Sequence, residues 1–544
     1  MPSLPTILAD AVTAVAGIDP ELRPATHPRF GHYQTNVALR LANEAGRPPR
    51  EVAAGLVERL DLGEWCEPPE VAGPGFINLR LRADVLARAA ASVLDDPRCG
   101  VPVTQTPKRV VIDYSSPNVA KQMHVGHLRT TIIGDCFNRV LTALGDTVVP
   151  QNHIGDWGRQ FGMLIEQIAD EGLDLDALDL PGAEALYLRA NQHLDADAGF
   201  ADRARARVVA LQGGDPDTLA VWRRLIEISE RGFNQTYARL NVLLTDDDVA
   251  GESSYNDALA GICDDLAERG LATMDADALV CFVPGFDAPA ILRNSAGGYG
   301  YDVTDVAALR RRVEVLRADR LIYVTDARQA GHFALLFGVC RLAGYLPDSV
   351  SAEHVGYGMV LGTDSRPFKT REGKAAYLDD LLDAAEEIAA PEIALAAIKY
   401  ADLSNQLQKD YVFDAARMVQ TRGDTGPYLQ YAHARACSVL REAEAREIAV
   451  GPLLRVDSAE EQALALELSR FGETVALVGQ TLQPHRLCLH LFELATAYMV
   501  FYENCPILKS DGDVRASRLA LCLATRRVLA MGLDLLGIAA PECM

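Results

Sequence analysis

Two histidines and a lysine lie close together in the segment Asn118–His127, which reads NVAKQMHVGH. The segment follows a short β-branched run, and an amphipathic helix pattern begins near its end. A helix start favours an anion, because its first N–H groups have no partner within the helix and its dipole is positive there. His124 and His127 share one helix face, and Lys121 adds a mobile cation. Gly126 would let a flat ring or a phosphate approach the backbone.

This arrangement suits a nucleoside triphosphate that is bound without a glycine-rich loop. Polyphosphate chemistry depends on positioning and charge neutralisation more than on a side-chain acid or base. Taken alone, the pattern HxGH could equally be two surface histidines at a helix start. The rest of the chain must distinguish the two interpretations.

The elements around this segment predict a parallel sheet. Val110–Tyr114 is a short apolar strand pattern, Val125–Leu144 is a helix pattern, and a second strand begins at Thr147. Strand, helix and strand in this order are typical of a βαβ unit. Further strand patterns lie at Leu279–Val283 and Arg320–Thr325. Between about 165 and 245 the sequence is helical and rich in acids, which indicates an insertion into the sheet domain.

The two ends of the chain differ from the middle. Helix patterns near the N-terminus occupy Leu4–Val15, Gln34–Ala45 and Pro49–Leu60. An alternating strand, Phe76–Leu81, follows, and a linker is expected near Pro102–Pro107. From about Ile393 onward strand signals almost vanish, and long amphipathic runs occupy Tyr428–Arg446, Glu460–Gly479 and Asp513–Leu536. We therefore expect three domains, at 1–104, at 105–392 with an insertion near 165–285, and at 393–544.

Composition limits the class of protein. The chain has 544 residues, of which 49% are hydrophobic and 23% charged, so it can form several globular cores. A net charge of −23 argues against a general nucleic-acid coat, although only the local field at a binding face decides such contacts. The eleven cysteines form no CxxC pair, which argues against a zinc ribbon or a disulfide framework and fits the cytoplasm. We expect neither a signal peptide nor a membrane span.

Three long segments carry a resemblance to a known family. They are Asp113–Lys121 (DYSSPNVAK), Asn152–Gly162 (NHIGDWGRQFG) and Gly423–Arg435 (GDTGPYLQYAHAR). The chain resembles the class I aminoacyl-tRNA synthetases, with His124–His127 as the HIGH signature, and more narrowly the arginyl-tRNA synthetase family. The resemblance covers nearly the whole chain. It implies a Rossmann-type parallel-sheet catalytic domain with a helical insertion, a small N-terminal α/β domain that binds tRNA, and a C-terminal anticodon-binding helical bundle.

The resemblance also implies a reaction. The arginine carboxylate would attack the α-phosphate of ATP to give arginyl-adenylate and pyrophosphate, in a step that depends on tRNA. The terminal ribose hydroxyl of tRNA(Arg) would then accept the arginyl group. ATP would enter with Mg²⁺, without a dedicated metal site in the protein. The family is mostly monomeric, so a monomer is expected.

The ATP-site residues follow from the same resemblance. Lys121 would replace the second lysine of a degenerate KMSKS loop within Met359–Gly373, and Lys369 would be the loop's own cation. The implied catalytic residues are Lys121, His124, His127 and Lys369. The implied ATP-binding residues are Gly126, His332, Met359 and Val360.

The amino-acid site can also be argued from charge, because a guanidinium is best recognised by carboxylates. The resemblance implies an arginine site made of Asn118, Glu252, Tyr301, Asp305 and Gln329. Tyr301 and Asp305 are spaced i and i+4, so a helix would place them on one face. In isolation, Glu252 and Asp305 could be a helix cap and an exposed acid. Asp302 is an unexpected extra acid, which would either bind the cation more tightly or point outward.

For tRNA, the resemblance implies contacts from Phe76 and Asn78 near the N-terminus, although Phe76 could equally be a core residue. In the helical domain it implies Tyr428, Arg435, Tyr502 and Met544. Cys543 stands where the family usually has arginine. Three hypotheses remain: a complete synthetase, a duplicate copy for a specialised pathway or for inhibitor resistance, and a non-catalytic tRNA-binding relative. The joint presence of the proposed site residues favours an enzyme.

Overall fold

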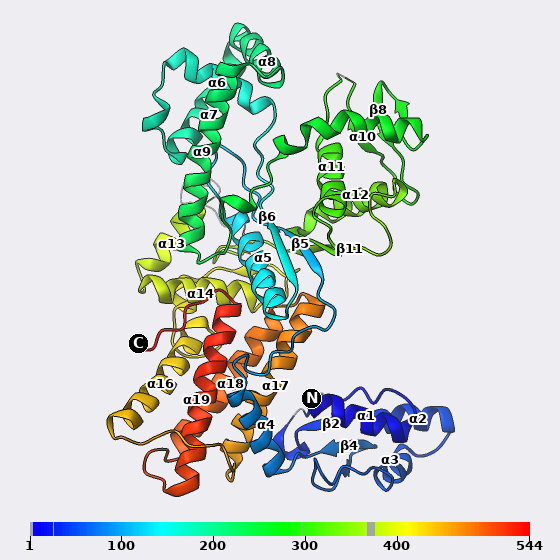
Figure 1. The fold of residues 1–544 in the computed structure, drawn as a ribbon, viewed down its shortest axis with the longest axis vertical. Coiled ribbons are helices and arrows are strands. Elements are labelled where there is room, and N and C mark those ends of the chain that lie inside the picture. The colour runs from blue at the N-terminus through cyan, green and yellow to red at the C-terminus, as the bar shows by residue number, and fades with distance from the viewer. Residues whose placement is uncertain (1–3, 26, 296, 367–375) are drawn as a thin grey trace.

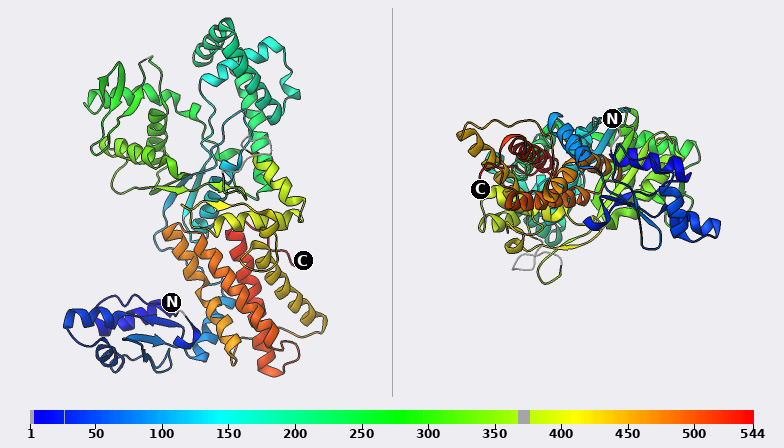
Figure 2. Two further views of the ribbon diagram at one scale, coloured as in Figure 1. Left: turned by 180° about the vertical axis from the view of Figure 1, so that it is seen from behind. Right: turned by 90° about the horizontal axis from the view of Figure 1, so that it is seen from below.

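The computed structural model describes residues 4–25, 27–295, 297–366 and 376–544. The molecule is elongated, with a helical bundle at one end, a parallel sheet above it and two lobes beyond the sheet (Figure 1). The N-terminal domain projects sideways from the bundle, as the rear view in Figure 2 also shows. The sheet therefore lies between the bundle and the two lobes.

The central sheet has four parallel strands in the order β11–β10–β5–β6. Their bounds are β5 Arg109–Asp113, β6 Thr147–Gln151, β10 Arg320–Asp326 and β11 Ser351–Tyr357. From β5 the chain moves outward to β6, whereas from β10 it moves in the opposite direction to β11. The loops that leave the carboxyl ends of β5 and β10 therefore flank the point where ligands bind in doubly wound sheets. The Rossmann-type expectation is confirmed.

Alternate residues of the strands face two different cores. Val110 and Ile112 pack with α5 (Val125–Ala143) on one face. Val111, Leu321 and Tyr323 pack on the other face, with helices α10 Asn256–Glu268, α11 Tyr301–Glu314 and α12 Ala330–Leu342. Because both faces are covered, the two central strands β5 and β10 contain continuous apolar runs rather than alternating patterns.

The two lobes are inserted after β6. The first contains four helices, α6 Arg159–Glu171, α7 Leu180–Ala196, α8 Ala198–Gln212 and α9 Pro216–Arg239, together with the 3₁₀ turns η2 Leu175–Ala177 and η3 Asp246–Asp248. The second combines α10 and α11 with an antiparallel sheet of β7 Thr273–Asp275, β8 Ala278–Cys281 and β9 Ala290–Arg293, and α12, which follows β10, packs against α11. The strand predicted at Leu279–Val283 is β8, but it lies outside the parallel sheet because short connections pair it with β7 and β9.

The N-terminal domain is a small α/β unit. Its elements are α1 Leu4–Ala16, β1 Arg23–Pro24, η1 Pro28–Phe30, β2 Tyr33–Thr35, α2 Val37–Ala45, α3 Pro49–Val57, β3 Glu70–Ala72 and β4 Phe76–Leu79. The helix predicted from Gln34 begins only at Val37, because Tyr33–Thr35 pairs with β4. The next helix, α4 (Ala83–Asp95), packs against the C-terminal bundle rather than against this domain's sheet.

The C-terminal part is almost wholly helical. Its helices are α13 Leu378–Glu386, α14 Pro391–Leu403, α15 Ala415–Met418, α16 Gly426–Ala445, α17 Ala459–Thr481, α18 His485–Asn504 and α19 Gly512–Leu535. One short parallel pairing, β12 Val360–Leu361 with β13 Tyr411–Val412, joins this part to the segment after β11. In the described part of the chain, no helix is both long and apolar enough to cross a membrane.

Candidate active site

The loop between β5 and α5 has a strained backbone. Three residues other than glycine adopt positive φ: Ser115 (74°), Ser116 (52°) and Ala120 (60°). Side chains from three other elements accept their N–H groups, namely Thr130 Oγ1 (3.0 Å), Asn152 Oδ1 (3.0 Å) and Ser229 Oγ (2.9 Å). Such strain persists only where surrounding contacts determine the conformation, and it is common at functional sites.

Backbone N–H groups at the start of α5 fix the tautomer of both histidines. His127 Nδ1 accepts the backbone N–H of His124 at 3.1 Å, and His124 Nδ1 accepts the backbone N–H of Gly126 at 2.9 Å. Because each Nδ1 accepts, each neutral ring carries its proton on Nε2. Burial lowers the pKa of His127 to about 3 and lowers the pKa of His124. At neutral pH the pair therefore presents two Nε2–H donors rather than two cations.

The backbone at the start of α5 differs from the sequence prediction. The N–H of Val125 donates to Ala376 O, and the N–H of His127 donates to His124 O. With the Gly126 N–H also used, these first N–H groups have partners within the chain. Gly126 has no Cβ because the His124 ring occupies that space, where a Cβ would lie 2.5 Å from Cε1. An anion at this position would thus meet imidazole Nε2–H groups instead of free backbone N–H groups.

Lys121 lies next to the insertion lobe. Its Nζ is 4.3 Å from the centre of the Tyr187 ring on α7. The neighbouring Gln122 donates from both its backbone and its side chain to Glu184 on the same helix, at 3.2 and 2.9 Å. The insertion lobe therefore contacts the loop that leads into the histidine pair.

The segment expected to carry Lys369 lies outside the described residues, but both of its flanks are described. On one side, Met359 donates its N–H to Asp410 Oδ1 at 2.6 Å, and Val360 is buried in β12. On the other side, Leu378 donates its N–H to Met123 O at 2.9 Å. The chain after this segment is therefore paired with the residues that precede α5.

Glu252 is positioned by the loop after β6. It begins the 3₁₀ turn η4 (Glu252–Tyr255), and its N–H donates to Ile154 O at 3.1 Å. Asp156 fixes the turn, because its carboxylate accepts the backbone N–H and the hydroxyl of Ser253 at 2.8 and 2.5 Å. The NHIGD segment and Glu252 thus meet at the carboxyl edge of the sheet.

Asp305 and His332 form the centre of a cluster of acids and histidines. Asp305 Oδ2 lies 2.7 Å from His332 Nε2, and Asp305 Oδ1 lies 3.9 Å from His153 Nε2. The bond to Asp305 raises the pKa of His332, and Asp302 adds to the effect. The unexpected Asp302 points inward: its Oδ2 accepts the N–H of Ile291 at 2.7 Å, and its Oδ1 lies 3.5 Å from His332 Nδ1.

Glu252 belongs to the same electrostatic cluster. Burial raises the pKa of its carboxyl to about 7, and the nearby carboxylates of Asp156 and Asp305 act in the same direction. Without a cationic ligand, repulsion among these carboxylates has a free-energy cost, and protonation of Glu252 lowers that cost. A guanidinium placed among these carboxylates would lower it as well.

The other predicted arginine-site residues surround this cluster. Asn118 bridges to Gly155 in the loop after β6. Gln329 ends the 3₁₀ turn η5 (Ala327–Gln329) after β10. Tyr301 is the first residue of α11, with Asp305 one turn later as predicted, and its ring lies 5.3 Å from that of His332.

The histidine pair and the acidic cluster follow strands that end at the same edge of the sheet. Asn118 and His124 follow β5, whereas Gln329 and His332 follow the adjacent strand β10. Tyr357, which ends β11, donates its hydroxyl to Gly126 O at 3.4 Å. Three neighbouring strands therefore bring these residues to the same edge of the sheet.

Sequence reasoning assigned no role to three residues of this region. His153 and Asp156 lie in the NHIGD segment, which carried the resemblance, yet their contacts with α11 and η4 are made across long stretches of chain. His354 on β11 stacks on Phe333 with ring centres 4.8 Å apart and lies 2.9 Å from Thr325 Oγ1. Neither contact has a local sequence signal.

The predicted tRNA-contacting residues near the N-terminus lie on β4. Phe76 is half-buried, and Asn78 is buried. The Asn78 side chain already accepts a hydrogen bond from Gln34 Nε2 at 2.7 Å, across the sheet. Asn78 therefore stabilises the pairing of β2 with β4.

The predicted residues of the helical domain are partly brought together. Arg435 on α16 donates to the Tyr502 hydroxyl on α18 at 3.2 Å, and its guanidinium lies 5.0 Å from the centre of that ring. Tyr428 packs on Phe492, with ring centres 5.7 Å apart. Met544 is half-exposed at the C-terminus, where Arg441 contacts Cys543 Sγ at 3.1 Å.

Known families match almost the whole chain. Residues 91–415 match the family described as tRNA synthetases class I (R), catalytic domain. Residues 429–544 match the DALR anticodon binding domain, and residues 3–81 match the arginyl tRNA synthetase N terminal domain.

Individual proteins give the same result. The chain is 64% identical to an arginine–tRNA ligase of Cutibacterium acnes, over 100% of both proteins. It is 49% identical to an arginine–tRNA ligase of Frankia casuarinae, over 97% of this chain and 95% of that protein. Among solved structures, arginyl-tRNA synthetases of Plasmodium falciparum and Thermus thermophilus superpose with TM-scores of 0.85 and 0.83. The Plasmodium enzyme is 28% identical to this chain and the Thermus enzyme 27%. Both superpositions cover 99% of this chain, together with 98% of the Plasmodium chain and 100% of the Thermus chain. The chain belongs to the arginyl-tRNA synthetase family.

Proposed function

We propose that the residues gathered at the carboxyl edge of the sheet perform the two steps of arginine–tRNA ligation, the activity of the family. The observation that carries this proposal is the cluster of acids around Asp305. It lies at the same sheet edge as the His124–His127 pair. A cation-binding cluster of acids beside two donors for phosphate oxygens fits arginine and ATP bound side by side.

In the first step, the arginine carboxylate oxygen forms a bond to the α-phosphorus of ATP, and the bond from that phosphorus to the pyrophosphate oxygen breaks. Negative charge develops on the phosphate oxygens and the leaving pyrophosphate. The Nε2–H groups of His124 and His127 donate to these oxygens. Lys121 and Lys369 supply positive charge, and Gly126, His332, Met359 and Val360 line the ATP site.

The guanidinium of arginine binds between Asp305 and Glu252. Glu252 loses its proton when the guanidinium binds, because the positive charge favours the ionised form of the carboxyl group. Tyr301 covers the acidic cluster, and Asn118 and Gln329 hold the α-amino and α-carboxylate groups. In the second step, the terminal ribose hydroxyl of tRNA(Arg) attacks the arginyl carbonyl carbon, and AMP leaves.

The tRNA contacts are assigned to both ends of the chain. Phe76 contacts the body of the tRNA from the N-terminal domain, and Asn78, which is buried, supports the strand that carries Phe76. Tyr428, Arg435, Tyr502 and Met544 contact the anticodon. The exposed half of Met544 and the Arg435–Tyr502 pair support this assignment, since an aromatic ring beside a guanidinium suits base stacking and phosphate binding.

Mg²⁺ is proposed to enter as part of the MgATP substrate. Within the described residues, no group of three or more histidine, cysteine or acidic side chains could hold a metal ion. The histidine pair offers N–H donors, which suit phosphate oxygens and not a cation. We further propose domain boundaries at 1–104, 105–392 and 393–544, a monomer, and a place in the cytoplasm, where ten buried cysteine thiols remain reduced.

The decisive experiment is ATP–pyrophosphate exchange with each amino acid, in the presence and absence of tRNA. We expect exchange that is specific for arginine and that requires tRNA. Exchange with another amino acid would contradict the substrate, and no exchange under any condition would favour a non-catalytic tRNA-binding protein. If arginine is activated, deletion of the gene would distinguish an essential enzyme from a specialised duplicate.

A further inference from the structure

A buried ion pair lies directly behind the histidine pair. Arg129, two residues after His127 on α5, has a side chain 1% exposed, and Asp402 on α14 has one 0% exposed. The Arg129 Nε lies 3.2 Å from Asp402 Oδ2. The rings of Tyr357 and Tyr411 lie 5.6 and 5.3 Å from the guanidinium. Burying two charges carries a large desolvation cost, so stability alone is a weak reason for such a pair.

A second nitrogen of the Arg129 guanidinium, Nη1, is directed at the backbone around the proposed ATP segment. Its Nη1 donates to Gly358 O at 2.9 Å and to Lys409 O at 3.1 Å. Gly358 directly precedes Met359 and Val360, the proposed ATP contacts. One guanidinium therefore joins the helix of the histidine pair, the ATP segment and the loop before β13.

Neighbouring bonds fasten the same segment to the same loop. The N–H of Gly358 donates to Leu407 O at 2.9 Å, and the N–H of Met359 donates to Asp410 Oδ1 at 2.6 Å. A Cβ on Gly358 would lie 2.6 Å from Asp410 Oδ1, so only glycine permits this approach. The position of residues 358–361 thus depends on α5 and on the chain that follows α14.

We propose that Arg129 and Asp402 are positioning residues for ATP. Arg129 holds the backbone of residues 358–361 at a fixed distance from the Nε2–H groups of His124 and His127, and Asp402 holds the Arg129 guanidinium in place. The pair acts through the backbone and does not itself touch the substrates. This inference rests on the proposed function, because it needs ATP to bind between α5 and residues 358–361.

The structure predicts a selective kinetic effect. Asp402→Asn keeps the size of the side chain but leaves Arg129 without its charged partner, so the guanidinium loses its fixed orientation. Misplacement of a binding group by about 1 Å can cost on the order of 100-fold in rate. We expect the KM for ATP to rise about tenfold or more, while the KM for arginine stays within about twofold, since the acidic cluster is carried by η4 and α11.

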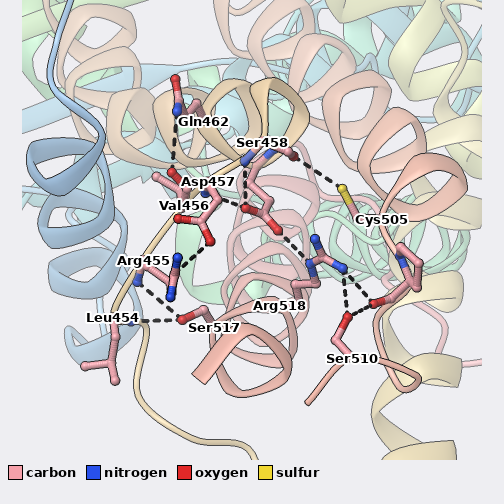
Figure 3. Close-up of polar contacts among 12 residues, drawn as sticks. Leu454, Arg455, Val456, Asp457, Ser458, Gln462, Cys505, Ser510, Ser517 and Arg518 are labelled. Atoms are coloured by element: carbon pink, nitrogen blue, oxygen red, sulfur yellow. Dashed lines mark hydrogen bonds and ion pairs between the residues drawn. The ribbon is translucent and has the colours of Figure 1, made fainter. Parts of the chain in front are cut away.

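The matched control is a second buried ion pair in the helical bundle. Arg518 Nε lies 2.6 Å from Glu461 Oε1, and the Glu461 side chain is 3% exposed. Figure 3 shows Arg518 beside Ser458 and Ser510 in a polar cluster between the ends of helices. From Glu461, α17 runs about 27 Å to Gly479, where its far end meets the sheet domain. Glu461→Gln should lower the unfolding temperature without changing the KM for ATP.

A second variant tests the proposal even if Asp402→Asn does not fold. Asp410 is exposed, so Asp410→Ala removes the acceptor of the Met359 N–H without burying an unpaired charge. Asp410→Ala should also raise the KM for ATP selectively. The KM for ATP of Arg129→Lys should lie between those of wild type and Arg129→Ala.

ATP–pyrophosphate exchange is measured for each variant with saturating tRNA, and the unfolding temperature of each variant is measured as well. A selective rise in the KM for ATP in Asp402→Asn and Asp410→Ala, and not in Glu461→Gln, supports the proposal. The proposal is overturned if Asp402→Asn folds and its KM for ATP is unchanged. If Asp402→Asn does not fold, an unchanged KM for ATP in Asp410→Ala overturns the proposal. Absence of exchange in the wild-type chain would instead overturn the proposed function, so the two failures are distinguishable.

Discussion

Lys121 Nζ lies 4.3 Å from the centre of the Tyr187 ring, so a residue of the ATP loop is held by a helix of the insertion lobe. The contact joins two parts of the chain that are 66 residues apart in sequence. A lysine side chain is long and flexible, and an aromatic face restricts where its charge can be. The insertion lobe thus restricts the position of the charge that is proposed to act on the leaving pyrophosphate.

This contact gives the first prediction. Lys121→Met should lower kcat for arginine activation by about 100- to 1000-fold, because a charge near the leaving pyrophosphate is lost. Tyr187→Leu should have a smaller effect, below about tenfold, because the lysine remains but its placement loosens. Single-turnover adenylate formation measures both. Tyr187→Phe, which keeps an aromatic ring, is the control and should behave like wild type.

Gly126→Ala separates stability from activity. Alanine favours a helix over glycine by about 1 kcal/mol, so the first turn of α5 should not be weakened by propensity. The new Cβ would lie 2.5 Å from His124 Cε1 and must displace that ring. We expect kcat to fall at least tenfold while the far-ultraviolet circular dichroism and the unfolding temperature remain close to those of wild type. Full activity in this variant would show that the position of the His124 ring is not needed.

Arginine binding should depend on pH through Glu252. Its pKa of about 7 in the absence of arginine means that the carboxyl is protonated below pH 7, and a neutral carboxyl pairs poorly with a guanidinium. The KM for arginine should therefore rise as pH falls through 7 and level off above it. Calorimetry in buffers of different ionisation enthalpy should detect proton release near pH 6.5. Glu252→Gln should bind arginine weakly at every pH and lose this proton release.

The two aspartates of α11 should differ in their contributions. Asp305→Asn removes the charge proposed to pair with the guanidinium, which is worth about 2–3 kcal/mol, so the KM for arginine should rise roughly 30- to 150-fold. Asp302→Asn should raise it less than about fivefold, because one oxygen of Asp302 already accepts the N–H of Ile291. Both changes should lower the pKa of His332, which NMR titration can follow. Equal effects of the two variants on arginine binding would contradict the assignment of Asp305.

Much of the architecture could be predicted because local patterns are strong. The helix predicted at Val125–Leu144 is α5, the strand at Arg320–Thr325 is β10, and the acid-rich region after 165 is a helical lobe. Short pieces were less predictable. Gln34 and Thr35 lie in the predicted helix Gln34–Ala45 but belong to β2, because pairing with β4 outweighs helix propensity there. The strand β8 joins a separate antiparallel sheet, a choice that strand propensity alone does not contain.

The sequence by itself determined the residue types of the site and the i, i+4 spacing of Tyr301 and Asp305, because both are local properties of the chain. Only the tertiary structure decided that Asp302 points inward, that the Val125 N–H at the start of α5 donates to Ala376 O, and that Asp156 supports Glu252. These features depend on contacts between segments about 10 to 250 residues apart in sequence. Such contacts are set by packing at the carboxyl edge of the sheet, and no local pattern encodes them.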